Sequence, residues 1–224
     1  KTRQELFIAR DRYGIKPLYY ILQGNIFLFA SEQKAILAHP AVERTIDLDA
    51  VLEYFTFQNI FTDKTLLRGI KLLPAGQWAK IPLGSNKNHI NTVQYWDFYF
   101  TEPEYQLKEE EYIEETDRLF RQAVDRQLVS DVEVGAYLSG GMDSGSITAI
   151  AATRLPYIKT FTCGFDLHSA SGLEMGFDER ESAEFMSYLF KTEHYEMVLK
   201  AGDMERVLPK LAWHLEEPRV GQSY

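Results

Sequence analysis

A short segment of the chain combines serines, glycines and one aspartate in a pattern that could bind phosphate. Its residues are Ser139, Gly140, Gly141, Asp143 and Ser144. An apolar run over 134–138 precedes them and 145–154 has helical character, so the sequence predicts a strand, a glycine turn and a helix N-terminus. In that geometry the glycines let the backbone approach an anion, while the first helical N–H groups and the helix dipole attract it.

Asp143 indicates which kind of phosphate group the loop is built for. The loop has no lysine and therefore lacks the G-x-x-x-x-G-K-[ST] pattern. A carboxylate at contact distance from a phosphate would be repelled by about 4 kcal/mol at an effective dielectric of about 20. A divalent cation between the two anions removes this conflict, and Mg²⁺ is usually held by one or two carboxylates and phosphate oxygens.

We therefore predict a loop that holds a Mg²⁺-bound pyrophosphate group, with the hydroxyls of Ser139 and Ser144 as additional donors. The alternative is a tight turn between a strand and a helix, in which Ser144 is only the helix N-cap.

The composition limits the classes of protein to which the chain can belong. With 224 residues, of which 45% are hydrophobic, it can form one large domain or two small ones. A formal net charge of −9 argues against nucleic acid as a partner, because a phosphate-binding face needs a basic stripe. No apolar run reaches the roughly 18 residues of a membrane span, so we expect no membrane partner. The single cysteine, Cys163, excludes an internal disulfide and predicts a cytoplasmic location.

The first part of the chain, residues 1–100, alternates short apolar runs with turn signals and predicts an α+β domain. Its strands are expected at 6–9, 18–22, 26–30, 77–81 and 92–100. Ser31 is the expected N-cap of a helix that reaches Ala38, and Asp47 or Asp49 is expected to open a helix through Phe57. Residues 101–108 carry a proline and acidic residues and predict a linker.

The second part, residues 109–224, alternates helices with strands. Apolar residues recur every three or four positions from Glu109 to Leu128 and predict a long helix. Strands are expected at 134–138, 158–165 and 195–199, and a further helix at 178–190. This alternation indicates an open parallel sheet of the α/β class, in which ligands bind at the carboxyl ends of the strands. The loop that begins at Ser139 lies at such an end.

The S-G-G-x-D-S string resembles the pyrophosphate loop of the N-type ATP pyrophosphatases. Several segments in order resemble the later part of the glutaminase domain of glutamine-hydrolysing asparagine synthetases: IARDRYGIKPLYY (8–20), FASEQKA (29–35), GIKLLPAG (69–76) and YW (95–96). Further segments resemble the entry to the synthetase domain of that family: SDVEVG (130–135), FTCGF (161–165), FDE (177–179), Ala183 and KTEH (191–194). The resemblance covers almost the whole chain in two ordered blocks.

The resemblance implies part of an N-terminal-nucleophile glutaminase-type domain, followed by part of an ATP pyrophosphatase domain like the adenine nucleotide alpha hydrolases. It also implies an ATP-dependent ligase that converts aspartate to asparagine through an acyl-adenylate and releases AMP and pyrophosphate. Ammonia would come from glutamine. The implied partners are the small molecules aspartate, glutamine and ATP, and a homodimer is compatible with the resemblance.

The same resemblance implies roles for individual residues. Ser139, Gly140, Gly141 and Ser144 would hold the pyrophosphate portion of ATP, and Asp143 would bind Mg²⁺. Two further residues, Leu138 and Cys163, would line the adenine and ribose pocket at adjacent strand ends.

The chain departs from the family pattern at several positions. The family's glutaminase nucleophile is an N-terminal cysteine with its own α-amine as base, whereas residue 1 here is Lys1. Cys163 lies inside an expected strand and cannot replace it. The downstream G-x-G-x-D-E segment is absent, and Gly145 replaces the serine or threonine that usually follows Ser144. We therefore expect a middle fragment of a longer enzyme, inactive alone, in which no catalytic residue can be named.

Two alternatives remain open at this point. One is a related amidotransferase, such as a β-lactam synthetase-like enzyme, that acts on another carboxylate. The other is a non-catalytic nucleotide-binding homologue. Asp143 argues against the second, because a site that no longer binds a metal has no need of a carboxylate in a phosphate loop.

Other charged residues have structural explanations first. Asp178 is expected to cap the helix that follows it, with a substrate role as the alternative. Arg10 and Asp11 are expected to form a structural ion pair, with a place at the domain interface or in an ammonia path as the alternative. Glu216 and Glu217 follow a helical pattern and are expected at a solvated helix end, with proximity to the acyl-acceptor site as the alternative. The five histidines show no metal-ligand spacing.

Overall fold

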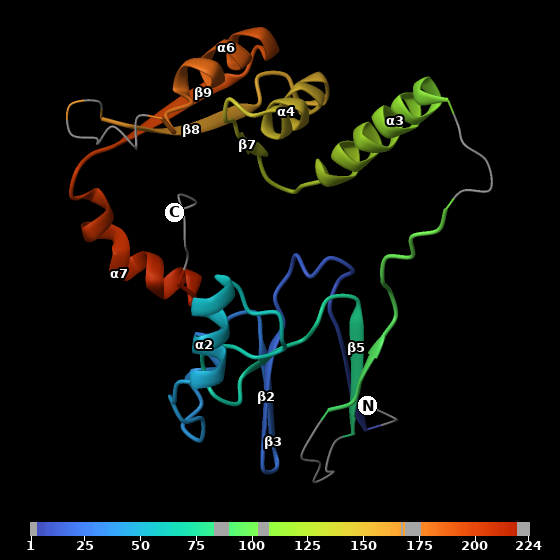
Figure 1. Ribbon diagram of the computed structural model, residues 1–224, viewed down its shortest axis with the longest axis vertical. Coiled ribbons are helices and arrows are strands. Elements are labelled where there is room, and N and C mark those ends of the chain that lie inside the picture. Colours follow the sequence, from blue (N-terminus) through green and yellow to red (C-terminus); the bar gives the residue numbers. More distant parts are fainter. Residues whose placement is uncertain (1–3, 83–89, 103–107, 167, 169–175, 219–224) are drawn as a thin grey trace. The chain divides into compact units, whose positions relative to one another are not determined.

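The computed structural model describes residues 4–82, 90–102, 108–166, 168 and 176–218 (Figure 1). Residues 83–89, between the strands expected at 77–81 and 92–100, and residues 103–107 of the expected linker are not among them. The chain packs into two compact units. Unit 1 comprises Lys1–Thr101 together with Leu208–Tyr224, and unit 2 comprises Glu102–Val207.

Unit 1 contains two antiparallel sheets of three strands each among the described residues. The first has the order β1-β5-β6 and consists of β1 (Glu5–Ala9), β5 (Gln77–Pro82) and β6 (Thr92–Gln94). The second has the order β3-β2-β4 and consists of β2 (Tyr19–Gln23), β3 (Ile26–Ala30) and β4 (Lys71–Leu72). The hairpin between β2 and β3 turns at Gly24, whose φ of 57° lies in the left-handed region that glycine adopts without strain.

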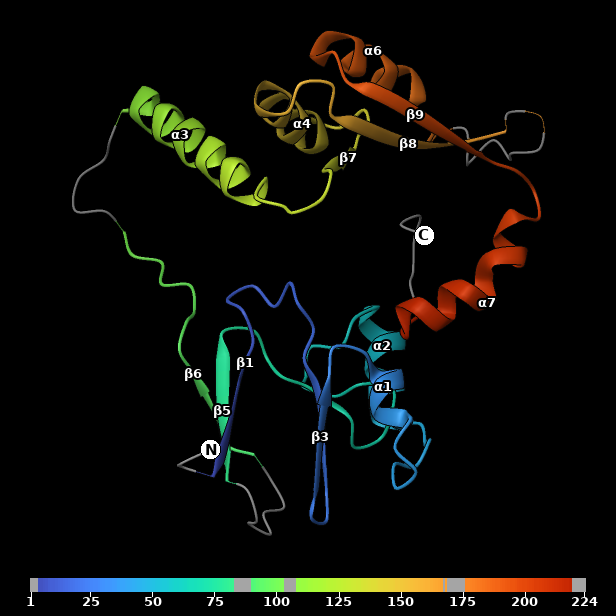
Figure 2. The ribbon, with the colours of Figure 1, turned by 180° about the vertical axis from the view of Figure 1, so that it is seen from behind.

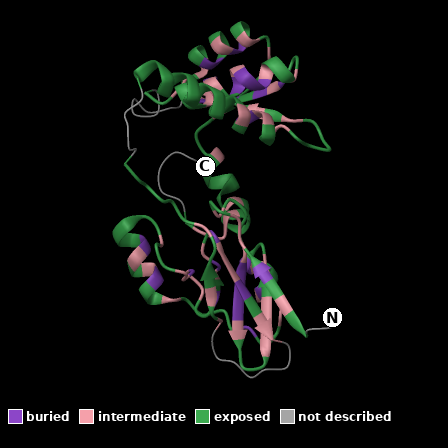
Figure 3. Cartoon of the chain, turned by 90° about the vertical axis from the view of Figure 1, so that its right-hand side faces the viewer, coloured by how far each residue is buried: buried purple, intermediate pink, exposed green. Residues whose placement is uncertain are grey.

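Strand β2 supplies both hydrophobic cores of unit 1, because its successive side chains point to opposite faces. Tyr19 and Ile21 pack with Ile36, Val42 and Ile70. On the other face, Tyr20 packs against residues of the first sheet and its surroundings, namely Ile8, Leu73 and Ala79. Figure 3 shows such buried residues along the central strands.

Two helices flank these sheets, and their N-termini differ from each other. Helix α2 (Leu48–Phe57) is capped as predicted by Asp47, whose carboxylate accepts hydrogen bonds from the N–H groups of Asp49 and Ala50 at 3.1 Å. Helix α1 (Gln33–Leu37) begins after Glu32 and has no cap from a neighbouring side chain. The prediction that Ser31 is its N-cap is therefore wrong.

The predicted ion pair between Arg10 and Asp11 is also wrong, because both side chains bind backbone groups instead. The Arg10 guanidinium donates to the carbonyl oxygens of Gly14, Lys16 and Leu73 at 2.6 to 3.1 Å. The Asp11 carboxylate accepts from the N–H groups of Tyr13, Ile15 and Lys16. These hydrogen bonds lower the pKa of Asp11 and fix the turn that follows β1.

The strand predicted over 92–100 ends early, at Gln94. The N–H groups of Tyr95 and Trp96 both donate to the carbonyl oxygen of Gly76, so the chain leaves the ladder at this point. Beyond it, the aromatic rings of Tyr13, Trp96 and Phe98 contact one another at centroid distances of 4.7 to 5.9 Å. The aromatic residues that suggested a longer strand therefore form a ring cluster.

Unit 2 contains a parallel sheet with the order β7-β8-β9, in agreement with the parallel sheet expected for this part of the chain. Its strands are β7 (Gly135–Tyr137), β8 (Lys159–Phe165) and β9 (Glu193–Leu199), and Figure 2 shows β8 and β9 side by side. Its helices are α3 (Glu109–Gln127), α4 (Met142–Arg154) and α6 (Arg180–Phe190). Helix α7 (Asp203–Leu215) begins in unit 2 and ends in unit 1.

The two faces of this sheet differ in burial. On β8, Thr160, Thr162 and Gly164 are buried, whereas Phe161 and Cys163 are exposed. A core beside the sheet joins α3 to α4 through Val124, Ile150, Ala151 and Ile158. The described residues include no helix that is both long and apolar enough to cross a membrane.

Candidate functional site

The loop predicted to bind phosphate leaves the sheet at the carboxyl end of β7. Leu138, the residue before this loop, is held by β8, because its N–H donates to the carbonyl oxygen of Phe161 at 2.9 Å. The hydroxyl of Thr162 donates to the carbonyl oxygen of Leu138. With 2% of its surface exposed, the Leu138 side chain is packed in the interior, so only its backbone faces the loop.

Ser139 and Ser144 close the loop through their hydroxyls. Their Oγ atoms lie 2.8 Å apart, and the N–H of Ser139 donates to the Ser144 Oγ at 3.1 Å. The N–H of Gly141 donates to the Ser139 Oγ at 3.2 Å. The six residues from Ser139 to Ser144 are thereby folded into one turn whose two hydroxyls meet at its centre.

Helix α4 begins at Met142, three residues earlier than predicted, with Gly141 as its N-cap. Asp143 and Ser144 therefore lie in the first helical turn, and the alternative in which Ser144 is the N-cap is wrong. The N–H groups of this turn have no acceptor within the helix, and they carry the positive end of its dipole. Asp143 is exposed, and among the described residues its carboxylate has no hydrogen-bond or ion-pair partner.

The glycines of the loop have separate physical explanations. A Cβ on Gly140 would lie 2.7 Å from the Cβ of Ser182, so glycine is needed there for α6 to approach the loop. A Cβ on Gly141 would meet only the Ser139 Oγ, at 3.2 Å. Gly145, which stands where the family resemblance led us to expect a hydroxyl, lies where a Cβ would be 2.9 Å from the sulfur of Met186.

Cys163 lies on β8, near the same edge of the sheet as the loop. Phe161 is paired with Tyr137, so Cys163 is two residues further toward the carboxyl end. Its side chain is exposed. Partial burial, followed by the negative charge of Asp178, raises the pKa of the Cys163 thiol.

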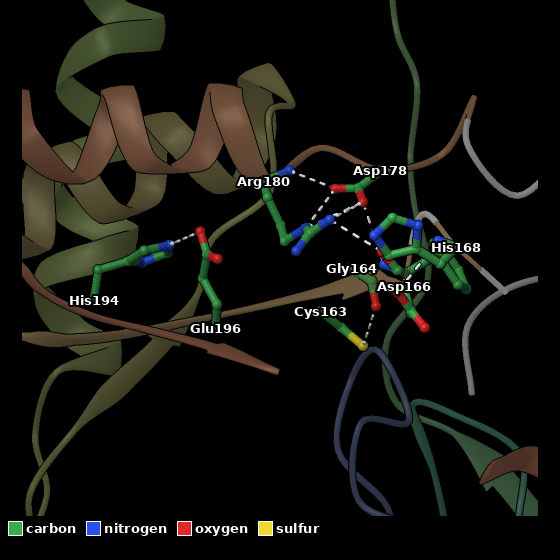
Figure 4. A network of polar contacts seen from close by, with 9 residues as sticks. Cys163, Gly164, Asp166, His168, Asp178, Arg180, His194 and Glu196 are labelled. Carbon is green, nitrogen blue, oxygen red and sulfur yellow. Dashed lines mark hydrogen bonds and ion pairs between the residues drawn. The ribbon is translucent and has the colours of Figure 1, made fainter. Parts of the chain in front are cut away.

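Asp178 and Arg180 form a charged pair at the carboxyl end of β8, which sequence reasoning only partly anticipated (Figure 4). The Arg180 guanidinium donates to both carboxylate oxygens, with Nε–Oδ1 at 2.9 Å and Nη2–Oδ2 at 2.7 Å. It also donates to the carbonyl oxygen of Phe165 at 3.0 Å. Arg180 was missed, although an arginine two residues after an aspartate at a helix start can fold back in this way.

The predicted capping role of Asp178 is confirmed in part. Its Oδ1 accepts from the N–H of Arg180, while the helix N-cap position itself is occupied by Glu179. Its Oδ2 accepts from the N–H of Phe165, so one carboxylate joins the end of β8 to the start of α6. Arg180 first, and then these N–H groups, lower the pKa of Asp178 to about 2.

The prediction of a solvated helix end at Glu216 is wrong. After α7, the Glu216 carboxylate accepts hydrogen bonds from the N–H groups of Gln33 and Lys34 in α1. Only 10% of its side chain is exposed. This long-range contact explains why α1 needs no cap from Ser31.

The donor set of the loop fits a Mg²⁺-bound phosphate group. It offers two hydroxyls, the N–H groups of a helical first turn and one exposed carboxylate. The described residues contain no group of three or more histidine, cysteine, aspartate or glutamate side chains that could hold a metal by themselves. A single carboxylate is sufficient for Mg²⁺ when phosphate oxygens and waters complete the coordination.

Comparisons with known proteins point to one enzyme family. Residues 1–96 match the glutamine amidotransferase domain family, and residues 115–224 match the asparagine synthase family. The chain is 35% identical to the glutamine-hydrolysing asparagine synthetase 3 of Bacillus subtilis over 234 residues, or 97% of this chain. It is 32% identical to asparagine synthetase 1 of the same organism over 220 residues.

The chain spans 35% and 32% of the length of these two Bacillus subtilis relatives, about a third of each. Both family matches lie in the order in which the two resembling blocks occur in the sequence. The chain therefore belongs to the family of glutamine-hydrolysing asparagine synthetases, of which it carries parts of both domains.

Proposed function

We propose that the full-length protein containing this chain makes asparagine from aspartate. In this reaction ATP converts the side-chain carboxylate of aspartate to an acyl-adenylate with release of pyrophosphate, and ammonia from glutamine then displaces AMP. One observation carries the proposal: the Ser139–Ser144 turn and the exposed Asp143 lie together at the carboxyl edge of a parallel sheet. The names of the relatives support the choice of substrates.

Each residue of the loop has a role in this proposal. The hydroxyls of Ser139 and Ser144 and the N–H groups of the first turn of α4 hold the pyrophosphate portion of ATP. Asp143 binds Mg²⁺, which when bound neutralises negative charge on the leaving pyrophosphate. The dipole of α4 adds to this stabilisation, because its positive end faces the loop.

Leu138 and Cys163 are proposed to flank the adenine and ribose. The backbone of Leu138 and the exposed side chain of Cys163 are the groups available, since the Leu138 side chain is buried. Asp178 and Arg180 stabilise this edge by joining β8 to α6.

The test is the exchange of labelled pyrophosphate into ATP by the full-length protein. We expect exchange in the presence of aspartate and Mg²⁺, and none without aspartate. Exchange that depends on a different carboxylate, as in a β-lactam synthetase-like enzyme, would overturn the proposed substrate. Binding of Mg-ATP without any exchange would overturn the proposed activity in favour of a non-catalytic homologue.

A further inference from the structure

The segment that follows α7 belongs to one family region by sequence but packs with the other. Residues 208–218 lie within the asparagine synthase match, yet in the structure they form part of unit 1 with residues of the amidotransferase match. Glu216 joins this segment to the start of α1. Its carboxylate accepts a hydrogen bond from the N–H of Gln33 at 2.5 Å and from the N–H of Lys34 at 2.8 Å.

The side chain of Lys34 adds further interactions with Glu216 and with the end of α7. Its Nζ lies 3.4 Å from the Glu216 carboxylate and 3.0 Å from that of Glu32, and it donates to the carbonyl oxygen of Trp213 at 3.2 Å. It also lies 5.5 Å from the centroid of the Trp213 ring, within the range of a cation–π contact. The side chains of Lys34 and Glu216 are 19% and 10% exposed, so their ion pair is largely shielded from solvent, whereas Glu32 is 55% exposed.

Two tyrosines hold the next two residues. The Tyr54 hydroxyl donates to the carbonyl oxygen of Pro218 at 2.8 Å, and the Tyr19 hydroxyl donates to the Glu217 carboxylate at 3.4 Å. We call Glu216, Glu217 and Pro218, with these partners on β2, α1 and α2, the α7 clasp. Because it uses two charged hydrogen bonds and a shielded lysine, it holds this segment in one position.

We propose that Glu216 is a positioning residue that couples ammonia release to asparagine synthesis. This inference rests on the proposed function. The clasp fixes a segment of the synthetase region to the amidotransferase domain, and α7 is one of the two places where the chain passes between the units. If that segment detaches, glutamine is still hydrolysed and ammonia supplied in solution is still used, but ammonia from glutamine is lost to the solvent.

The experiment compares full-length wild-type protein with Glu216→Ala and Glu216→Gln. For each protein, glutamine consumed per asparagine formed is measured, and asparagine formation from added ammonium chloride is measured separately. We expect Glu216→Ala to raise the glutamine-to-asparagine ratio at least about fivefold. Synthesis from ammonium should stay within about twofold of wild type. Glu216→Gln keeps one acceptor oxygen for the N–H groups and should show a smaller increase.

Glu205→Gln is the matched control, because Glu205 is an exposed glutamate on the same helix, and its ratio should equal that of wild type. If Glu216→Ala does not fold, Tyr54→Phe provides a second test, since it removes only the hydroxyl that binds Pro218. An unchanged ratio in Glu216→Ala, or in Tyr54→Phe where that replaces it, would overturn the coupling role. Failure of the wild type to use ammonium and aspartate would instead overturn the proposed function.

Discussion

The Oγ atoms of Ser139 and Ser144 lie 2.8 Å apart, so that the residue after the buried Leu138 is hydrogen bonded to the first turn of α4. Each hydroxyl proton can rotate, so either serine can also donate to a phosphate oxygen without moving its backbone. The same pair therefore stabilises the turn and, while its Oγ–Oγ hydrogen bond is intact, leaves one hydroxyl proton free to donate to a phosphate. These two roles can be separated, because the first is seen in stability and the second in activity.

The stabilising role predicts a measurable coupling between the two serines. Ser144→Ala should lower the free energy of unfolding by about 1 kcal/mol, because the Ser144 Oγ also accepts from the N–H of Ser139. Combined with Ser139→Ala, it should cost less than the sum of the two single changes, by about 0.5 kcal/mol or more. Urea denaturation followed by circular dichroism measures both quantities. Ser146→Ala, in the same helix, is the control and should be neutral or slightly stabilising. If the costs of Ser139→Ala and Ser144→Ala were strictly additive, this would contradict the pairing.

Asp143 should matter for activity and little for folding. In the full-length protein, Asp143→Asn should reduce aspartate-dependent pyrophosphate exchange about 100-fold, because the substituted side chain lacks the charge that holds Mg²⁺ beside the phosphates. Thermal unfolding should stay close to that of wild type, since the carboxylate is exposed and has no partner among the described residues. Glu114→Gln removes an exposed carboxylate on α3 and should leave both measurements unchanged. Full exchange activity in Asp143→Asn would show that this residue does not bind the metal.

Features that depend on near neighbours could be predicted from the sequence. The phosphate loop is marked by a strand, adjacent glycines and a helix within twenty residues, and the hairpin at Gly24 by a glycine between two apolar runs. Asp47 caps α2 through the N–H groups of the next residues in the chain, so its role is also visible locally. In each case the interacting groups are close in sequence, and residue type alone limits the geometry.

Features that depend on distant partners could not be predicted. The N-terminus of α1 is satisfied by Glu216, which is 183 residues from Gln33, and no local pattern around Ser31 reveals this. Strand β6 stops at Gln94 because a carbonyl on a distant turn, that of Gly76, accepts the next two N–H groups. Local propensity favoured a longer strand there, and the tertiary contact overrode it.

The Asp178–Arg180 pair predicts a specific dependence of stability on pH. Folding lowers the pKa of Asp178 from 3.8 to about 2, so its carboxylate stabilises the fold above the unfolded-state value and loses that contribution as pH falls from about 4 to about 2. Asp178→Asn should therefore cost about 2 kcal/mol at neutral pH, from weakened charged hydrogen bonds, and progressively less below pH of about 4. Urea denaturation at a series of pH values measures this difference. Asp131→Asn, which removes an exposed carboxylate, is the control for the loss of one charge. If the loss of unfolding free energy in Asp178→Asn were independent of pH, this would contradict the pairing.

The thiol of Cys163 provides a probe of the proposed nucleotide pocket. Partial burial and the charge of Asp178 raise its pKa, so alkylation by iodoacetamide should be slow near neutral pH and accelerate only above the ordinary thiol value. Asp178→Asn should speed the reaction at a fixed mildly alkaline pH, because a negative charge that disfavours the thiolate is removed. If Cys163 flanks the ribose and adenine, saturating Mg-ATP should slow its alkylation at least about tenfold, as measured by mass spectrometry of the peptide that contains it. The control is magnesium without nucleotide, which should give no protection. Unchanged alkylation in protein shown to bind Mg-ATP would place the nucleotide elsewhere.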